Sequence, residues 1–252
     1  MRIADVAALV TGAASGLGGA TARALAAKGA TVFGIDLPQV IERAHAVEGV
    51  TYVAADVTDP AQVGAAVEQA SGGDKPLRVT VNCAGIGTAG RVLSKKGPHD
   101  LDLYRKIIEV NLIGTFNVLR LAADAIAKTD PIADDARGVI VNTASIAAFD
   151  GQIGQVAYSS SKGGVVGLTL PAARDLAQFG IRVMTIAPGI VDTPMLAGVS
   201  DEFRAALSSG VPFPKRLARP EEYAQLVVAI AEHDYLNGEV IRMDGALRMA
   251  PR

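Results

Sequence analysis

Short apolar runs recur along the whole chain, at intervals that leave room for a helix between them. Most of these runs are apolar at every position instead of alternating with polar residues. Such runs are typical of strands that are covered on both faces. The predicted strands are Ala8–Val10, Thr31–Phe33, Tyr52–Ala54, Val79–Val81, Val139–Val141, Arg182–Ile186 and Val240–Ile241.

The segments between these runs have apolar residues at roughly helical spacing, as Leu103, Ile107 and Val110 do in the longest of them. The alternation predicts an α/β fold: one Rossmann-type, doubly wound parallel sheet with helices on both faces, in a single domain over residues 1–252. The predicted helices are Leu17–Lys28, Pro60–Gln69, Leu101–Lys128, Val156–Phe179 and Pro220–Glu232.

Two segments have neither pattern. Residues 85–100 are rich in Gly, Ser and Lys, and residues 188–214 contain four prolines. Each follows a predicted strand, and parallel sheets bind ligands at the carboxyl ends of their strands. We therefore expect both segments to be substrate loops. The second carries apolar residues suited to a lid over a substrate: Ile190, Val191, Met195, Leu196, Val199, Phe203 and Leu207.

A glycine-rich turn follows the first predicted strand, with the sequence TGAASGLG at Thr11–Gly18. Glycines at Gly12, Gly16 and Gly18 let the backbone turn tightly and approach a pyrophosphate, and the N–H groups of the following helix, around Ser15 and Leu17, favour an anion. The spacing differs from the common dinucleotide fingerprint, and a glycine-rich turn without a ligand is the alternative. The pattern favours a dinucleotide site.

Asp36 ends the second predicted strand, 18 residues after Gly18. A carboxylate there can accept hydrogen bonds from the adenosine ribose and would repel a 2′-phosphate. No arginine stands beside it, since Leu37 and Pro38 follow. We therefore predict NAD as the cofactor in preference to NADP, although a solvated loop aspartate would look the same.

Tyr158 and Lys162 are four residues apart in a helical pattern and share a face. A free tyrosine has a pKa of about 10 and is a poor base, but a neighbouring ammonium lowers that pKa. Ser145 follows the strand Val139–Val141 and could hold a substrate oxygen beside the tyrosine. Such a pair or serine alone is usually structural. Together they predict proton transfer by Tyr158, with hydride passing between substrate and nicotinamide.

At this point the sequence resembles the short-chain dehydrogenase/reductase family from end to end. The resemblance implies that Asp56 and Val57 flank the adenine, that Thr193 holds the nicotinamide carboxamide, and that Asn111 supports a water-linked proton path to Lys162. It also places the rest of the cofactor groove along Asn82, Cys83, Ala84, Gly85, Pro188, Gly189 and Val191. The matching residues are Thr11–Gly18, Asp56–Val57, Asn82–Gly85, Asn111, Ser145, Tyr158–Lys162, Pro188–Gly189 and Thr193.

A narrower resemblance, to the branch that interconverts 3-hydroxyacyl-CoA and 3-oxoacyl-CoA, rests on further segments. It implies an acyl-CoA substrate, whose phosphates Arg91, Lys95 and Lys96 could meet. The alternatives are a hydroxysteroid or another secondary alcohol, a 3-oxoacyl-carrier-protein thioester, and an NAD-binding scaffold without turnover. Val191-Asp192 departs from the Phe-Gly pair expected there, which bears on substrate preference. The segments are Asn82–Ile86, Lys95–Gly97, Asn111–Val118, Leu168–Leu176 and Val211–Pro214.

Composition narrows the possible partners. The 252 residues include 24 basic and 26 acidic side chains, a net charge of −2, with no tryptophan and 4% aromatic residues. No nucleic-acid partner is expected from this balance. Apolar runs such as Gly163–Ala173 are too short to span a membrane, and the strand pattern at Val6–Thr11 leaves no room for a preceding signal, which predicts a cytoplasmic protein. A chain of this length needs no metal or disulfide to bury a core.

The two longest predicted helices are apolar over much of their surface. Gly163, Gly164 and Gly167 would let another helix approach closely, and the family commonly pairs subunits through these helices. We therefore predict a homotetramer.

Overall fold

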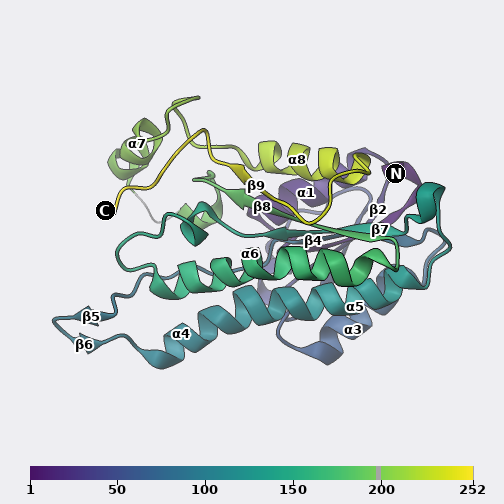
Figure 1. Cartoon of the computed structure of the whole chain (residues 1–252), viewed down its shortest axis with the longest axis horizontal. Helices are drawn as coiled ribbons and strands as arrows, with labels where there is room; N and C mark the ends of the chain where they lie inside the picture. Colours follow the sequence, from purple (N-terminus) through teal and green to yellow (C-terminus); the bar gives the residue numbers. More distant parts are fainter. Residues whose placement is uncertain (197–199, 252) are drawn as a thin grey trace.

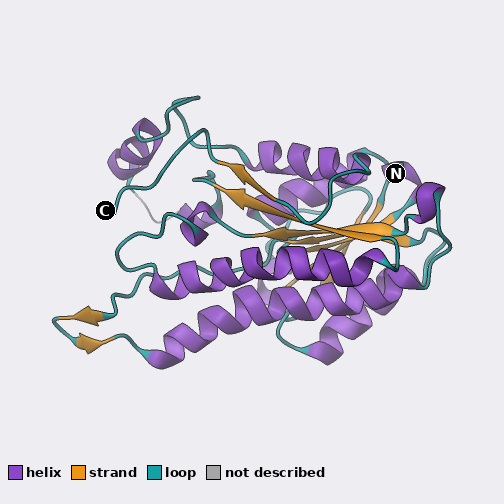
Figure 2. Cartoon of the chain, viewed as in Figure 1, coloured by secondary structure: helices purple, strands orange, loops and turns teal. Residues whose placement is uncertain are grey.

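Seven parallel strands form one central sheet in the computed structural model, which describes residues 1–196 and 200–251 (Figure 2). The strand order is β3-β2-β1-β4-β7-β8-β9, so the chain leaves β1 in one direction and resumes on its other side at β4. This is the predicted doubly wound topology. The strands are β1 Ala7–Thr11, β2 Thr31–Asp36, β3 Val50–Ala54, β4 Leu77–Asn82, β7 Gly138–Thr143, β8 Ile181–Pro188 and β9 Val240–Met243.

Helices cover both faces of the sheet, which explains why the strands are apolar at every position. Ala8 and Val10 pack in the core cluster beneath α1 and α8, whereas Leu9 between them packs in the cluster beneath α3, α5 and α6. Figure 1 shows these two layers on opposite sides of the sheet. The helices are α1 Gly16–Ala27, α3 Pro60–Ser71, α4 Leu101–Ile108, α5 Thr115–Ala127, α6 Val156–Ala177 and α8 Pro220–Glu232, with short turns η1 Ile3–Asp5, α2 Pro38–Ile41, η3 Ala133–Asp135 and η4 Ile146–Ala148.

A π-helical turn, η2 Glu109–Gly114, joins α4 to α5 within the single helix predicted there. Turns of this kind are frequent at functional sites, and this one contains Asn111. The whole stretch Leu101–Ala127 is long and apolar enough to cross a membrane by length and composition, which the shorter runs considered in the sequence did not suggest. Half of its most apolar window is buried inside the protein.

Both segments predicted to be irregular contain regular structure. Residues 85–100 include a short antiparallel hairpin, β5 Leu93–Ser94 and β6 Gly97–Pro98, and residues 188–214 include η5 Pro194–Leu196 and α7 Asp201–Ser209. The hairpin and α7 project at the same end of the molecule (Figure 1). Of the predicted lid, Val199 lies outside the described residues, and Val191 is buried against Ala218.

Candidate active site

The predicted site residues gather at one edge of the sheet. Asp36 ends β2, Ser145 follows β7 and Gly189 follows β8, and every strand pair in the sheet is parallel. The carboxyl ends of all seven strands therefore meet at that edge, where α/β sheets bind ligands. Segments far apart in the sequence thus share one site.

The glycine-rich turn is shaped by three glycines that no other residue could replace without strain. Gly12 and Gly16 have φ of +65° and +51°, which L side chains rarely adopt. A Cβ on Gly18 would lie 2.2 Å from the Gly12 carbonyl oxygen, so the third glycine lets α1 pack directly on the turn. Ser15 stands at the N-cap of α1 with no hydrogen bond from its side chain, and Leu17 follows in the first turn.

Asp36 supports this turn from the neighbouring strand. One carboxylate oxygen accepts a hydrogen bond from the Ala14 N–H at 3.0 Å, and the other accepts from the Leu37 N–H at 2.9 Å. A carboxylate oxygen can accept more than one hydrogen bond, so capacity remains for two ribose hydroxyls. Within the described chain no arginine hydrogen-bonds or pairs with Asp36.

The segment after β3 forms the next wall. Hydrogen bonds from the backbone and hydroxyl of Thr58 hold the pKa of Asp56 below its ordinary value. Val57 is buried, its carbonyl accepts from Asn117 Nδ2 at 2.9 Å, and a Cβ on Gly114 would reach within 2.7 Å of its side chain. Val57 is therefore held firmly, and its contact with the adenine stays a prediction.

The segment Asn82–Gly85 is fixed to both neighbouring strands. Thr11 Oγ1 accepts hydrogen bonds from the Cys83 and Ala84 N–H groups, each at 3.0 Å. Asn82 Nδ2 donates to Asn142 Oδ1 at 2.9 Å across the sheet. The Cys83 thiol is inert as a nucleophile here, because burial raises its pKa.

The loop after β8 faces the glycine-rich turn. A Cβ on Gly16 would lie 3.6 Å from the Thr193 side chain, which places these two predicted cofactor residues opposite each other. Pro188 ends β8, and a Cβ on Gly189 would lie 2.9 Å from the Asp244 Cα, so only glycine fits there.

These walls fit a nicotinamide dinucleotide. The positive-φ glycines leave free backbone at the start of α1, the Asp36 carboxylate lies beside it, and Thr193 borders it from the other side. An anionic pyrophosphate is stabilised by just such a helix N-terminus. Gly12 to Gly18 would hold the pyrophosphate, Asp36 the adenosine ribose, and Thr193 the nicotinamide end.

Lys162 is the most deeply buried charged group of the site. The residue is only 4% exposed, and its ammonium donates to the Thr143 carbonyl at 2.7 Å. Burial lowers its pKa from 10.5 to about 8. The ammonium lies 5.9 Å from the centre of the Tyr158 ring.

Tyr158 differs from the sequence-based expectation. Burial raises the pKa of its phenol, and the hydrogen-bonding Ser145 side chain only partly opposes this effect. The Lys162 ammonium lies beside the ring and donates its hydrogen bond to the Thr143 carbonyl. The lowering of this pKa that the sequence suggests relies on Lys162 together with a bound nicotinamide cation, which would add a second positive charge beside the phenol.

Asn111 lies beside these residues, but its side chain is already occupied. Its amide donates to the Ile86 carbonyl at 2.9 Å and to Ser161 Oγ at 3.0 Å, and its Oδ1 accepts from the Ile86 N–H at 2.8 Å. A Cβ on Gly85 would approach both Asn111 Oδ1 and Lys162 Nζ, at 3.2 and 3.6 Å. Asn111 thus closes the site around Lys162, and its role in a proton path remains a prediction.

Sequence reasoning missed Thr143 and Asn142, which hold the site together, and named Thr11 only as the start of the glycine-rich motif. Thr143 supplies the carbonyl that binds Lys162, Thr11 ties β1 to β4, and Asn142 pairs with Asn82. All three lie at or next to the carboxyl ends of strands. A polar residue at the end of an otherwise apolar strand was the available signal.

Comparisons with known proteins agree with this geometry. The sequence matches the profile of the short chain dehydrogenase family over residues 6–203. It is 53% identical to the 3-hydroxyacyl-CoA dehydrogenase type-2 of Bos taurus over 249 residues, 97% of this chain and 95% of the relative. It is 52% identical to the enzyme of the same name from Drosophila melanogaster, over 99% of this chain and 100% of the relative. The crystal structure of a 3-hydroxyacyl-CoA dehydrogenase type-2 from Mycobacterium avium superimposes with a TM-score of 0.92 at 42% identity, covering 98% of both chains.

The chain therefore belongs to the short-chain dehydrogenase family and is an oxidoreductase that acts on secondary alcohols, in a family that uses NAD or NADP. The three relatives named above all carry the name 3-hydroxyacyl-CoA dehydrogenase type-2.

Proposed function

We propose that this protein oxidises 3-hydroxyacyl-CoA thioesters to 3-oxoacyl-CoA with NAD, and catalyses the reverse reaction with NADH. The basic hairpin, whose base is hydrogen-bonded to the segment just before α6, is the observation that carries the substrate assignment. The names of the three relatives support it independently, at 42–53% identity over nearly the whole chain.

The residues divide the chemistry between them. Ser145 binds the substrate oxygen, and the Tyr158 phenolate accepts the hydroxyl proton as the carbon–oxygen double bond forms. The nicotinamide, when bound, accepts the hydride from the same carbon. Lys162 stabilises the phenolate through its charge and is itself held by the Thr143 carbonyl. The proton would then leave Tyr158 along the predicted path past Lys162 and Asn111, which are both buried.

The hairpin supplies positive charge for the CoA phosphates. Lys95 and Lys96 form its exposed turn, where Ser94 Oγ accepts from the Lys96 N–H at 3.2 Å. The base of the hairpin is anchored to the approach of α6, since the Gly90 N–H donates to the Gly154 carbonyl at 2.8 Å. The turn can therefore reach a ligand tail while its base stays next to Tyr158.

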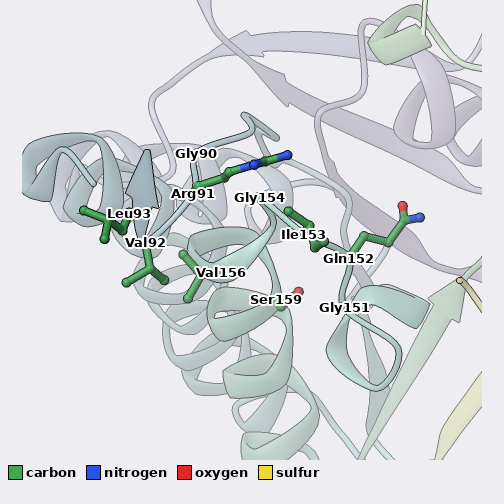
Figure 3. A pocket seen from close by; sticks show the side chains of 10 residues that line it. All are labelled: Gly90, Arg91, Val92, Leu93, Gly151, Gln152, Ile153, Gly154, Val156 and Ser159. Carbon is green, nitrogen blue, oxygen red and sulfur yellow. The ribbon is translucent and has the colours of Figure 1, made fainter. Parts of the chain in front are cut away.

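A pocket of about 450 Å³ lies between the hairpin base and α6 (Figure 3). Its walls combine the apolar side chains of Val92, Leu93 and Ile153 with the Arg91 guanidinium and the Gln152 amide. Ser159, which also lines it, is one residue from Tyr158 and so about 100° around the helix from the catalytic face. The pocket thus borders the first turn of α6, which carries Tyr158, and we expect it to take the pantetheine arm of a CoA ester.

Charge reversal in the hairpin tests the substrate. We expect Lys95→Glu/Lys96→Glu to raise KM for acetoacetyl-CoA by about tenfold or more, because two attractive contacts with phosphate become repulsive. KM for an uncharged ketone should hardly change. The control is Lys28→Glu/Lys128→Glu, the same charge change at the C-terminal ends of α1 and α5, near the amino edge of the sheet. Because these lysines pair with Glu232 and Asp124, NADH binding is measured to show that the control is folded. Good activity on a hydroxysteroid with none on acetoacetyl-CoA would replace the proposal by the steroid alternative, and binding of NADH with no turnover on any substrate would favour a scaffold.

NAD preference is assigned to Asp36. We expect Asp36→Ala to weaken NADH binding and to narrow the gap between NADH and NADPH, because the carboxylate both binds the ribose hydroxyls and repels a 2′-phosphate. Dissociation constants for the two cofactors, measured by NADH and NADPH fluorescence, check this directly. Wild-type turnover with NADPH equal to that with NADH would contradict the assignment, and would also revive the carrier-protein reductase alternative.

The assembly we propose is a homotetramer. Large apolar side chains remain exposed on the outer face of the α4–α5 and α6 layer, among them Ile113, Phe116 and Leu170. A second copy of the chain would cover them, and closed symmetry is the usual outcome of such pairing.

A further inference from the structure

The loop that carries Ser145 leaves the sheet at Ala144, whose N–H makes the last hydrogen bond to β8, to the Ile186 carbonyl at 2.8 Å. Ser145 follows β7 and caps η4, with its Oγ accepting from the Ala147 N–H at 3.1 Å. The chain then leaves the sheet edge through Phe149 and Asp150 before α6 begins. The direction of the Ser145 hydroxyl therefore depends on what holds η4 and the two residues after it.

Arg242, near the end of β9, holds those two residues. Its guanidinium donates to both carboxylate oxygens of Asp150, at 2.6 and 3.4 Å, and lies 5.2 Å from the centre of the Phe149 ring. The same group donates to Asp244 Oδ2 at 2.8 Å and to the Leu247 carbonyl at 3.1 Å. One side chain thus joins the serine loop to the C-terminal tail.

The tail completes the contact from the other side. Leu247 is buried and packs in one cluster with Ile146, the residue next to Ser145. Farther along, Gln152 Nε2 donates to the Ala250 carbonyl at 2.9 Å and the Ile153 N–H donates to the Pro251 carbonyl at 3.0 Å. The tail therefore lies along the whole serine loop, and Arg242 stands at its start.

We propose that Arg242 is a positioning residue for the alcohol–ketone reaction, which fixes the Ser145 loop against the C-terminal tail and so aims the Ser145 hydroxyl at Tyr158 and the substrate oxygen. The inference rests on the roles proposed above for Ser145 and Tyr158, and is independent of the CoA substrate. Arg242 contacts no predicted cofactor-binding residue directly, although its partner Asp244 packs on Gly189, so NADH affinity is measured beside the chemistry around Ser145.

The Arg242 network is stronger than an ordinary surface ion pair. The side chains of Arg242, Asp150 and Asp244 are 21%, 19% and 8% exposed, so water screens them little. A planar guanidinium satisfies Asp150, Asp244 and a carbonyl at once, which a lysine ammonium at the same place could not do with that geometry. Arg242 also keeps the pKa of Asp150 below its ordinary value, so the pair stays charged across the working pH range.

The test compares Arg242→Leu with Arg248→Leu. Arg248 donates to the same Asp244 oxygen at 3.1 Å but has no hydrogen bond to the serine loop. Replacing it therefore removes the same charge and a contact with the same carboxylate, and leaves the serine loop in place. We expect Arg242→Leu to lower kcat/KM for the oxidation of a good substrate by roughly tenfold, the factor for about one weakened hydrogen bond. Arg248→Leu should stay near wild type, and NADH affinity should stay unchanged in both.

Two further readouts separate positioning from mere structural weakening. The hydrogen-bonding Ser145 side chain lowers the Tyr158 pKa, so loss of its alignment should move the rising limb of the pH–kcat/KM profile to higher pH, in the direction of Ser145→Ala. In the Ser145→Ala background, Arg242→Leu should then change kcat/KM little, because the hydroxyl that it aims is gone. Asp150→Asn, which is isosteric, tests the same contact from the loop side if Arg242→Leu does not fold.

The inference would be overturned if the rising limb of the pH–kcat/KM profile stayed at the wild-type pH in Arg242→Leu or Asp150→Asn. It would also be overturned if Arg242→Leu lowered kcat/KM by the same factor in the Ser145→Ala background as in the wild type. An unmoved limb in Ser145→Ala would show that the role proposed for Ser145 is wrong, and the inference would fall with it. Wild-type turnover of acetoacetyl-CoA reports separately on the proposed substrate, since the Arg242 comparison can use any secondary alcohol that the wild type oxidises.

Discussion

Lys162 shows at the scale of one residue how the site trades stability for chemistry. Its charged form is unfavourable inside the protein, because burial lowers its pKa from 10.5 to about 8. That shift corresponds to roughly 3 kcal/mol of unfavourable free energy in the folded state while the group is charged. The proposed reaction needs this charge next to Tyr158, and the hydrogen bond to the Thr143 carbonyl holds it in place.

Lys162→Met should therefore abolish turnover and stabilise the fold at neutral pH. We expect a gain of about 1–2 kcal/mol at pH 7, because the burial penalty disappears while the Thr143 carbonyl loses a donor. The penalty is fully present below pH 8, shrinks as pH rises from 8 toward 10.5, and is absent above that. Urea unfolding of both proteins at pH 7 and near pH 10 measures the difference. A gain that does not shrink with pH, or a less stable Met variant at pH 7, would contradict this account.

At the scale of one element, replacing a helical glycine by alanine should change stability in opposite directions in α1 and in α3. Gly18→Ala would place a methyl 2.2 Å from the Gly12 carbonyl oxygen, whereas Gly64→Ala in α3 meets no atom within 4 Å. We expect Gly18→Ala to lose about 1–3 kcal/mol of stability by overpacking. NADH binding should weaken by about tenfold or more, because the glycine-rich turn must move.

Gly64→Ala is the matched control and should gain about 0.5–1 kcal/mol with unchanged NADH affinity, because alanine loses less backbone entropy in a helix. Thermal unfolding and NADH titration of both variants provide the comparison. Equal effects of the two substitutions on cofactor affinity would mean that close packing of α1 on the turn is unimportant.

The elements also show how far the sequence determines the structure. The parallel strands and the long helices could be predicted because burial on both faces leaves unbroken apolar runs such as Ala7–Thr11. The π turn at Glu109–Gly114 could not be predicted, because a single wider turn is too short to be recognised in the spacing of apolar residues. The β5–β6 hairpin has two residues per strand, which is too short for a period. The site residues were found by motif, whereas supporting contacts such as Tyr223 to Thr143, at 2.7 Å, depend on packing between distant segments.

At the scale of the whole molecule, the outer face of α5 and α6 remains more apolar than solvent contact favours. Ile113, Phe116 and Leu170 are 45%, 52% and 44% exposed. Gly163 and Gly167 have open space where a Cβ would be, so they face outward and permit close approach, whereas Gly164 packs inward on Leu112. The sequence treated all three glycines alike, and the structure assigns only two of them to the proposed interface.

Phe116→Asp should therefore convert the proposed homotetramer to smaller species. A charge at the centre of the apolar face would be buried without a partner on association, at a cost of several kcal/mol per interface. The control is Ile132→Asp, which places the same charge on an exposed apolar position in the loop after α5, outside the two helices. Light scattering coupled to size-exclusion chromatography at micromolar concentration distinguishes the species, and NADH binding reports that the variant is folded. A wild type that elutes as a monomer, or a Phe116→Asp variant that remains a tetramer, would mean that another surface, or none, joins the subunits.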